Sequence, residues 1–295
     1  RLIVATQHCP ATLHRHLPAR WGDRLRIALR EGPRVTGDGA GYRGTAHAVA
    51  ANLPEIEASP SPVVLVLAGD HATDIDLAAL LAAHRRSGAP ATVAATAVPL
   101  AQARGLGVVE AGPDGRIAAF HEKPEAPPPL PGNPALALAS QGLYAFDRDW
   151  LAARLREDLA APASSHDFGH DLLPRAVARG EAAAWRSEGY WRDVGTLDAF
   201  REASVEIARG LGPRDLPPAN PALAPPERPR GLSFEAGGLQ LSAPLVGARR
   251  PGRWTLVEDS VLMPGARLAP GARLSRAIVA PGAVVPAGLA IGEEP

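Results

Sequence analysis

The sequence predicts an α/β domain with a mostly parallel sheet, followed by a linker and a β-helix. Strand patterns alternate with amphipathic helix patterns over residues 1–210. Seven prolines fall within residues 211–230, a composition typical of a stiff, extended linker. Apolar residues then recur every six positions within residues 231–295. We therefore expect a first domain over 1–210, a linker over 211–230 and a β-helix over 231–295.

The first domain shows its elements as apolar runs and capping residues. Residues 63–68 form a continuous apolar run, which predicts a strand buried on both faces. Residues 74–87 predict a helix, with Thr73 or Asp74 as its N-cap and Gly88 just past its end. The other predicted elements are strands at 91–98 and 143–146, a helix from about 149, and a helix capped by Thr196 that ends at Gly210.

The last segment has a hexapeptide period with one irregular step. A set of apolar residues is spaced by six, with a single step of five after the fourth member: Leu256, Leu262, Leu268, Leu274, Val279, Val285 and Ile291. The glycines slip at the same place: Gly265 and Gly271, then Gly282 and Gly288. Two residue types slipping together favour a β-helix of about two coils over a Pro/Gly-rich tail with accidental spacing.

Charge and composition exclude several classes of protein. The 31 basic and 31 acidic residues balance, which argues against a general binder of nucleic acids or anionic membranes. No apolar run approaches the ~20 residues of a membrane span. The single cysteine, Cys9, excludes an intrachain disulfide and fits a reducing compartment such as the cytoplasm. We expect Cys9 to be a small buried hydrophobe rather than a catalytic thiol.

The single lysine, Lys123, stands out because every other basic residue among the 31 is arginine. A composition that replaces lysine by arginine wherever either will serve leaves Lys123 as a candidate for a role that needs a compact ammonium. The alternative is a surface position that kept lysine by chance.

Two aspartates are candidates for a magnesium site. Asp70 follows the predicted strand at 63–68, and ligands bind outside the carboxyl ends of parallel strands. A carboxylate there suits Mg²⁺, which prefers oxygen ligands and brings phosphates with it. Asp193, just before the helix capped by Thr196, would supply a second carboxylate. For both aspartates the alternative is a helix N-cap.

The remaining motifs are weaker. Residues 39–44 match G-x-G-x-x-G without the flanking strand and acidic residue of a dinucleotide site. The loop opens a helix at Thr45, where a base or phosphate could approach the backbone. His166 and His170 are four residues apart, and for them we expect ordinary polar roles rather than zinc binding. The chain contains neither a P-loop nor a G-x-S-x-G motif.

Taken together, several segments resemble bacterial ADP-glucose pyrophosphorylase (glucose-1-phosphate adenylyltransferase). They occur in that family's order and at similar spacing: Tyr-Arg-Gly-Thr-Ala at 42–46, Leu-Ala-Gly-Asp-His at 67–71, Glu-Lys-Pro at 122–124, Ser-Ser-His-Asp-Phe-Gly at 164–169, Asp-Leu-Leu-Pro at 171–174 and Tyr-Trp-Arg-Asp-Val-Gly-Thr at 190–196. Sugar nucleotidyltransferases in general share the Gly-Asp and Glu-Lys-Pro elements. The resemblance implies a Rossmann-like nucleotidyltransferase domain with a C-terminal left-handed β-helix.

The resemblance also implies a reaction and a set of site residues. ATP and glucose 1-phosphate would give ADP-glucose and pyrophosphate, in a cytoplasmic, allosteric homotetramer that serves glycogen synthesis. The implied roles are Mg²⁺ binding for Asp70 and Asp193, sugar-phosphate binding for Lys123, contacts to glucose hydroxyls for Glu122 and Ser140, and lining of the nucleotide or sugar pocket for Tyr42 and Gly107. The alternatives are a sugar nucleotidyltransferase that uses another nucleotide, or a non-catalytic regulatory or scaffolding subunit of the same family.

The chain departs from the family at its start and in one loop. The family begins with a strand and a glycine-rich loop that grips the triphosphate, whereas this chain opens on Arg1 directly in a strand-like run. We therefore expect an N-terminal truncation and, because a buried strand would be missing, marginal stability of residues 1–295. Gly41 stands where the enterobacterial form has a tryptophan tied to activation, and His47 where it has an acid. Both positions bear on regulation more than on chemistry.

Overall fold

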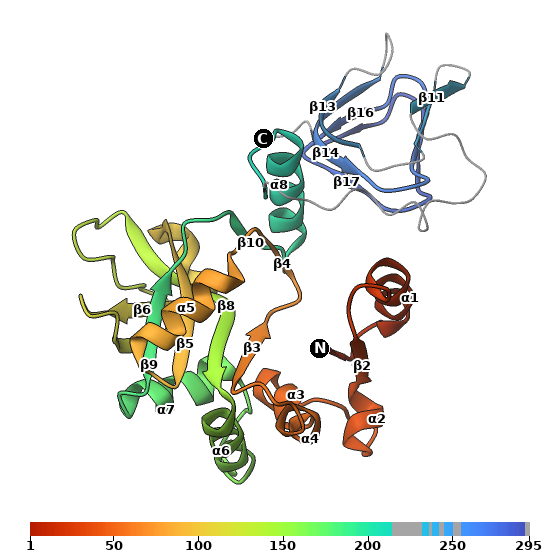
Figure 1. Cartoon of the computed structure of the whole chain (residues 1–295). Coiled ribbons are helices and arrows are strands. Elements are labelled where there is room, and N and C mark those ends of the chain that lie inside the picture. The colour runs from red at the N-terminus through yellow and green to blue at the C-terminus, as the bar shows by residue number, and fades with distance from the viewer. Residues whose placement is uncertain (214–231, 236–237, 242–244, 250–254, 293–295) are drawn as a thin grey trace. The chain divides into compact units, whose positions relative to one another are not determined.

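The computed structural model describes residues 1–213, 232–235, 238–241, 245–249 and 255–292 (Figure 1). Residue contacts divide the chain into two compact units. Unit 1 contains Arg1–Gly69 and Ile75–Glu188, and unit 2 contains Asp70–Asp74 and Gly189–Pro295. Most of the predicted linker lies outside the described residues, so the predicted domain boundaries stay a prediction.

Unit 1 is built on a central sheet with β8 in its middle. The strands are β3 (Val63–Leu67), β5 (Ala91–Pro99), β6 (Gly107–Ala111), β7 (Ile117–Glu122), β8 (Leu136–Asp147) and β9 (Ala182–Arg186). β8 is antiparallel to β3, β5 and β6, while β9 is parallel to β5. β3, β5, β6 and β9 therefore point the same way, and β7 and β8 run opposite. The expected mostly parallel sheet is confirmed in the sense that four of these six strands point the same way. The pairs that the central β8 forms with its neighbours are nevertheless antiparallel.

Helices cover both faces of this sheet because side chains alternate along its strands. On one face, Leu80 of α5 (Leu77–Ser87) packs with Leu143 and Ala145 of β8. On the other face, Phe146 of β8 packs with Leu151. The helices of that second face are α3 (Thr45–Ala50), α6 (Arg148–Leu159) and α7 (Leu173–Ala178). Unit 1 also contains shorter helical segments: α4 (Leu53–Glu57), η1 (Leu100–Gly105) and η2 (Phe168–Leu172).

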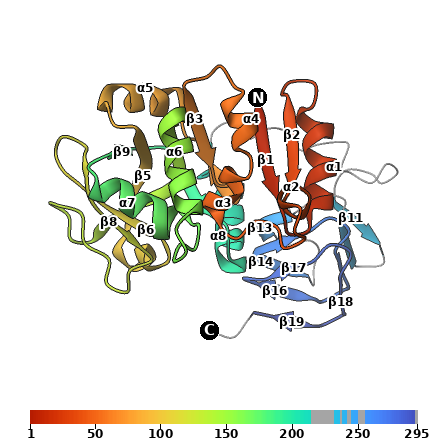
Figure 2. The same cartoon turned by 90° about the horizontal axis from the view of Figure 1, so that it is seen from below.

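The N-terminal part of unit 1 forms a separate parallel pair, β1 (Leu2–Thr6) with β2 (Ile27–Glu31). Figure 2 shows this pair beside α1 (Pro10–Trp21), and α2 (Gly32–Thr36) follows β2. Among the described residues, β1 pairs with β2 and β3 with β8, and each of β1 and β3 keeps one edge without a strand partner. The predicted preceding strand stays a prediction.

The prediction for Cys9 is wrong. Cys9 is exposed and has a φ of 46°, because it lies in the tight turn between β1 and α1 rather than on an apolar face of either element.

The predicted helix at 74–87 begins later than expected. Its N-cap is Asp76, whose carboxylate accepts the amide N–H groups of Ala78 and Ala79, both at 2.9 Å. Thr73 and Asp74 were therefore wrong as caps. The physical reason is tertiary: His71–Thr73 forms β4, which pairs with β10 (Trp191–Asp193) far along the chain.

Unit 2 contains that β4–β10 pair, helix α8 (Leu197–Ala208) and the C-terminal strands. The predicted cap of α8 is confirmed, since the Thr196 hydroxyl accepts the N–H of Ala199 at 3.1 Å. The C-terminal strands are β11 (Leu232–Glu235), β12 (Gly238–Leu241), β13 (Leu245–Arg249), β14 (Leu256–Leu262), β15 (Arg267–Leu268), β16 (Arg273–Ser275), β17 (Ile278–Val279), β18 (Val284–Val285) and β19 (Ala290–Ile291).

The C-terminal strands stack as a β-helix in which successive coils are 17 residues apart. Leu262 pairs with Val279, 17 positions on, and the same offset holds for the next two parallel pairs. These pairs are Leu268 with Val285 and Leu274 with Ile291. The predicted hexapeptide architecture is confirmed, and the step of five recurs in each described coil rather than occurring once.

The first member of the predicted six-residue series is displaced for the same reason. Val257, not Leu256, lies opposite Leu274 and is fully buried, whereas Leu256 is half-buried. The shortened step falls where Asp259 has a φ of 41° and Arg276 a φ of 49°. These left-handed residues turn the chain one position early, which removes one residue from the corner of each coil.

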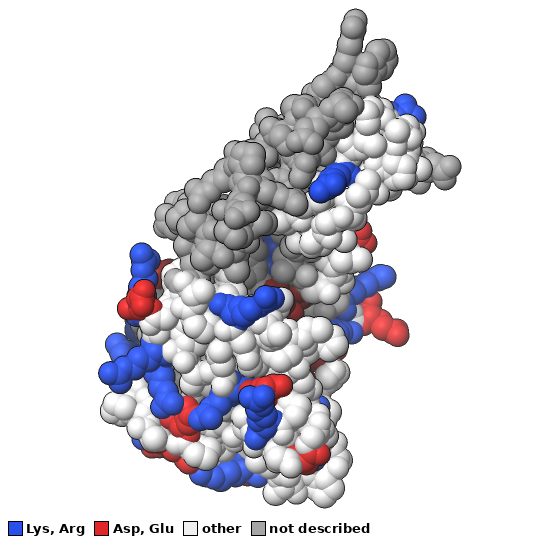
Figure 3. Space-filling view, turned by 90° about the vertical axis from the view of Figure 1, so that its right-hand side faces the viewer, with Lys and Arg blue, Asp and Glu red and all other residues white. Residues whose placement is uncertain are grey.

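Surface charges are mixed. Arginine and acidic side chains are interspersed over the described residues of the face in Figure 3, in line with the balanced composition. Within the described part of the chain, every helix is too short or too polar to cross a membrane.

Candidate active site

The Glu122 carboxylate lies in a cradle made by two glycines of unit 1. β6 and β7 pair so that Gly107 is opposite Glu122. A Cβ atom on Gly107 would lie 3.2 Å from Oε2 of Glu122, and one on Gly169 would lie 2.7 Å from its Cδ. The Glu122 side chain is only 17% exposed. Any side chain at Gly169 would therefore displace the carboxylate.

Lys123 follows directly and turns away from the strand. Its φ is 46°, and its N–H donates to the carbonyl of Leu106 at 3.1 Å. Its ammonium lies 3.9 Å from Oε1 of Glu122, and its side chain is 63% exposed. The structure thus brings together three predicted residues, Gly107, Glu122 and Lys123. A carboxylate and an exposed cation stand side by side at the end of one strand.

The electrostatics of Glu122 reflect its burial. Burial raises the pKa of Glu122, and the charge of Asp167 raises it further, while Lys123 and His170 lower it. Asp167 accepts the N–H groups of Gly169 and His170 at 2.8 and 3.1 Å, which sets the backbone of this segment against Glu122. The sequence prediction did not assign Gly169 or His170 to the site. The Asp-Phe-Gly motif at 167–169 was the available signal.

Ser140 lies on β8 and is 7% exposed. Its hydroxyl accepts the N–H of Gly142 at 3.3 Å. Burial raises the pKa of Tyr144 to about 12; a hydrogen bond from Ser140 lowers it, and the charges of Glu122 and Asp167 raise it. Tyr144 therefore links Ser140 electrostatically to the Glu122 cradle.

Tyr42 makes its contacts elsewhere in unit 1. The Tyr42 hydroxyl donates to the carbonyl of Arg30 at 3.1 Å, and the side-chain amide of Gln7 donates to the backbone carbonyl of Tyr42 at 3.2 Å. Its ring meets that of His47 edge-on, with centroids 6.3 Å apart. These contacts tie Tyr42 to the β1–β2 segment, and its place in a substrate pocket stays a prediction.

The glycine-rich loop before Thr45 leads into α3, and two amides of that helix's first turn are already paired within the chain. The second and third N–H groups of α3, those of Ala46 and His47, both donate to the carbonyl of His166, at 2.9 and 3.2 Å. A Cβ on Gly44 would lie 2.6 Å from the carbonyl oxygen of Ser165. The carbonyl of His166 thus occupies two amides of this first turn, and the expected approach of a base or phosphate to the backbone here stays a prediction.

Asp70 and Asp193 lie together in unit 2. The N–H of Val194 donates to the carbonyl of Asp70 at 3.0 Å, and Oδ1 of Asp193 accepts the N–H of Gly195 at 2.7 Å. A Cβ on Gly195 would lie 2.9 Å from Oδ1 of Asp193 and 3.8 Å from Oδ2 of Asp70. Both predicted carboxylates thus border the space beside Gly195, although 123 positions separate them in the sequence.

The donor set fits Mg²⁺. Two carboxylates supply hard oxygen ligands, and such a site is completed by substrate phosphates and water. Among the described residues, no cluster of three or more His, Cys, Asp or Glu side chains forms a closed cage of the kind that holds structural zinc.

Comparison with known proteins gives matches to two families and to named relatives. Residues 1–210 match the nucleotidyl transferase family, and residues 244–295 match the GlmU-like, C-terminal hexapeptide family. The glucose-1-phosphate adenylyltransferase of Paramagnetospirillum magneticum is 36% identical over 334 residues, covering 100% of this chain and 78% of that protein. The enzyme of the same name from Novosphingobium aromaticivorans is 35% identical over 334 residues, covering 100% and 80%.

The chain belongs to the glucose-1-phosphate adenylyltransferase family. The resemblance inferred from the sequence is confirmed, and so is the combination of a nucleotidyltransferase domain with a hexapeptide β-helix.

This member of the glucose-1-phosphate adenylyltransferase family also contains a hydrogen-bond network, close to Asp193 in the sequence, that was not predicted. Glu206 of α8 accepts a hydrogen bond from the Tyr190 hydroxyl at 2.8 Å and two from the Arg192 guanidinium, one of them at 3.0 Å. Arg192 is therefore held by Glu206 rather than presented to a ligand. The sequence carried no signal for Glu206, because its partners lie on a different element.

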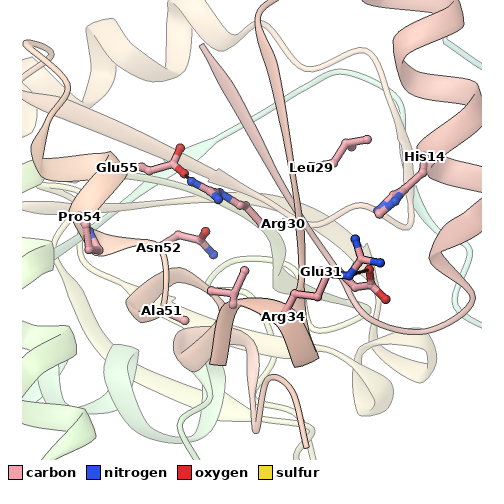
Figure 4. A pocket seen from close by; sticks show the side chains of 10 residues that line it. His14, Leu29, Arg30, Glu31, Arg34, Ala51, Asn52, Pro54 and Glu55 are labelled. Atoms are coloured by element: carbon pink, nitrogen blue, oxygen red, sulfur yellow. Dashed lines mark ion pairs between the residues drawn. The ribbon is translucent and has the colours of Figure 1, made fainter. Parts of the chain in front are cut away.

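The same family member also has a cavity of about 570 Å³ in the N-terminal part of unit 1 (Figure 4). Its two arginines are each paired with an acid: Arg30 with Glu55, and Arg34 with Glu31 at 3.1 Å. None of the predicted site residues is among the described residues that line this cavity. Because its cations are already paired, we do not assign a phosphate site there.

Proposed function

We propose that this chain catalyses the reaction of ATP with glucose 1-phosphate to form ADP-glucose and pyrophosphate, for glycogen synthesis. The observation that carries the proposal is the adjacency of the cradled Glu122 carboxylate and the exposed Lys123 ammonium. A sugar phosphate needs an acceptor for its hydroxyls and a cation for its phosphate, separated by a short distance. The names of the relatives support adenine as the base.

In the proposed reaction, a phosphate oxygen of glucose 1-phosphate attacks the α-phosphorus of ATP. That new P–O bond replaces the bond between the α-phosphorus and the oxygen bridging it to the β-phosphorus, and pyrophosphate leaves with that oxygen. The protein forms no covalent bond, so its residues act by positioning and charge. Lys123 would hold the sugar phosphate as a point charge. Glu122 and Ser140 would accept or donate hydrogen bonds to glucose hydroxyls, and Tyr42 and Gly107 would line the pocket.

Asp70 and Asp193 would hold Mg²⁺, which when bound offsets the negative charge of the triphosphate and of the leaving pyrophosphate. Support comes from the convergence of the two carboxylates beside Gly195. The homotetrameric assembly, allosteric control and cytoplasmic location implied by the family resemblance are proposed with the function. Sedimentation analysis of the purified protein tests the assembly.

The test of the function is pyrophosphate release from ATP and glucose 1-phosphate in the presence of Mg²⁺. We expect turnover, and a loss of about 100-fold or more in kcat for Asp193→Asn, since transition-state charge would lose its support. Asp198→Asn, on the first turn of α8, is the matched control and should retain activity.

Two results would redirect the proposal. Turnover with UTP or dTTP but not with ATP would assign the chain to a different sugar nucleotidyltransferase. Binding of glucose 1-phosphate with no turnover of any nucleoside triphosphate would assign it to a non-catalytic subunit.

A further inference from the structure

In unit 2, the side chain of His71 lies between those of Trp191 and Asp70. The indole Nε1–H of Trp191 donates to Nδ1 of His71 at 3.2 Å. The two rings meet edge to face, with centroids 5.3 Å apart and an interplanar angle of 81°. On its other side, Nε2 of His71 lies 3.6 Å from Oδ1 of Asp70. The His71 side chain is 8% exposed, whereas that of Asp70 is 64% exposed.

These contacts determine the tautomer of His71. An indole N–H is a donor only, so Nδ1 of His71 must be the acceptor and carries no hydrogen. In a neutral imidazole the hydrogen is then on Nε2, the nitrogen that faces Asp70. By fixing this tautomer, Trp191 makes His71 direct its Nε2–H toward the Asp70 carboxylate. At 3.6 Å the contact is longer than a hydrogen bond, so it acts as an orienting dipole on an otherwise exposed side chain.

The strand pairing explains why these residues meet. β4 and β10 are antiparallel, with Asp193 opposite His71 and Trp191 opposite Thr73. Directly opposed residues project from the same face, and residues two apart on one strand share that face. Trp191 is therefore the diagonal neighbour of His71, within reach of an aromatic side chain. One strand pair thus supplies Asp193 and also the two residues that stand behind Asp70.

We propose that Trp191 and His71 form a relay that positions Asp70 for cation binding, with Trp191 selecting the tautomer and His71 orienting the carboxylate. The proposal rests on the proposed function, because it takes Asp70 as a ligand of the cation. Trp191 and His71 act through Asp70 and are therefore positioning residues. Outer-shell partners of this kind typically contribute 10- to 100-fold to metal affinity. Ordering an exposed carboxylate before binding reduces the entropy that binding would otherwise cost.

The first experiment reads the tautomer directly. ¹⁵N NMR of the histidine rings in the cation-free protein should show His71 with its hydrogen on Nε2. In Trp191→Phe the constraint is lost, and we expect a mixture of both tautomers. Trp150→Phe is the matched control: the Trp150 indole Nε1 has no hydrogen-bond partner within the described residues, so the His71 signals should not change. A wild-type His71 with its hydrogen on Nδ1, or no change in Trp191→Phe, would overturn the relay.

The second experiment measures the consequence, using Mn²⁺ alone as the probe and electron paramagnetic resonance to count free ions. His71→Phe keeps a ring of similar shape without an N–H, and we expect its Kd for Mn²⁺ to rise about tenfold or more. His71→Gln places an amide N–H near the position of Nε2 and should recover most of that affinity. Circular dichroism confirms that each variant is folded, and Trp191→Phe supplies an independent, milder perturbation.

Asp70→Asn separates failure of the relay from failure of the function. If Asp70→Asn binds Mn²⁺ more weakly than wild type but His71→Phe binds it equally well, the relay is wrong and the metal site stands. If Asp70→Asn and wild type bind Mn²⁺ equally, the cation role of Asp70 is wrong, and the relay has no carboxylate ligand to position.

Discussion

A Cβ atom on Gly169 would lie 2.7 Å from Cδ of Glu122, so the backbone of one residue forms the wall against which the carboxylate of the other rests. Gly169→Ala should push the carboxylate out of place and lower kcat/KM for glucose 1-phosphate about tenfold or more, since small displacements in a positioned site are costly. Gly105→Ala, whose Cβ would meet open space, is the control. Equal kinetics of the two variants would remove Glu122 from the sugar site.

Replacement of Lys123 by arginine tests the sugar-phosphate role. The Lys123 side chain is 63% exposed beside Glu122, and a wide planar guanidinium does not reproduce a compact ammonium. We expect Lys123→Arg to raise KM for glucose 1-phosphate while KM for ATP changes little. Initial rates measured over both substrates decide the matter. Unchanged affinity for both substrates would take Lys123 out of the site.

Glu122 should make stability depend on pH in an unusual direction. Its pKa is raised above the ordinary 4.5, chiefly by burial and then by Asp167. A carboxyl with a raised folded-state pKa contributes stability below pH 4.5 and loses it as pH rises through the folded-state pKa. Urea unfolding at a series of pH values should show the free energy of unfolding of wild type falling relative to Glu122→Gln over that window. A difference that is constant with pH would contradict the assignment.

Glu206 should show the opposite dependence. Its hydrogen bonds from Arg192 hold its pKa below the ordinary 4.5. That contribution is present above pH 4.5 and is lost as pH falls through the folded-state pKa. Glu206→Gln should therefore be less stable than wild type by about 1–2 kcal/mol at neutral pH, with the gap closing in acid. Glu202→Gln, on the same helix with a side chain 53% exposed, should show almost no gap at either pH.

Gln141 offers a route to a more stable protein. It is fully buried, and neither its Oε1 nor its Nε2 has a hydrogen-bond partner within the described residues. An unpaired buried amide costs about 1–3 kcal/mol, and methionine has a similar shape without that cost. We expect Gln141→Met to raise Tm by a few degrees, and Gln102→Met, at an exposed position, to change it little. A lower Tm for Gln141→Met would mean that the amide is satisfied by bound water.

Features that depend on neighbouring residues were predictable. The apolar run at 63–68 predicts β3, and the Thr196 hydroxyl caps α8 as expected. The expected burial of β3 on both faces is wrong, because its residues are only half-buried and Leu67 is exposed. The Glu122–Lys123 adjacency is a property of the sequence itself, and the repeat period predicts the β-helix. Each of these follows from side-chain chemistry within a few residues.

Features that depend on a distant partner were missed. Asp76 caps α5 because the residues before it are drawn into pairing with β10. Val257 replaces Leu256 in the β-helix interior because the coil shortens at Asp259. The Gly169 wall depends on a segment 47 positions after Glu122. The Asp-Phe-Gly motif marks Gly169, but no local pattern says which distant residue it packs against.

The sequence by itself determined the family, the order of the elements and the residue types able to bind a sugar phosphate and a cation, because these depend on composition, spacing and local capping. Only the tertiary structure decided that Asp70 and Asp193 share one space beside Gly195, that Gly169 supports Glu122, and that Trp191 sets the tautomer of His71. These relations arise where strands and loops distant in sequence pack together, so their physical cause is long-range pairing.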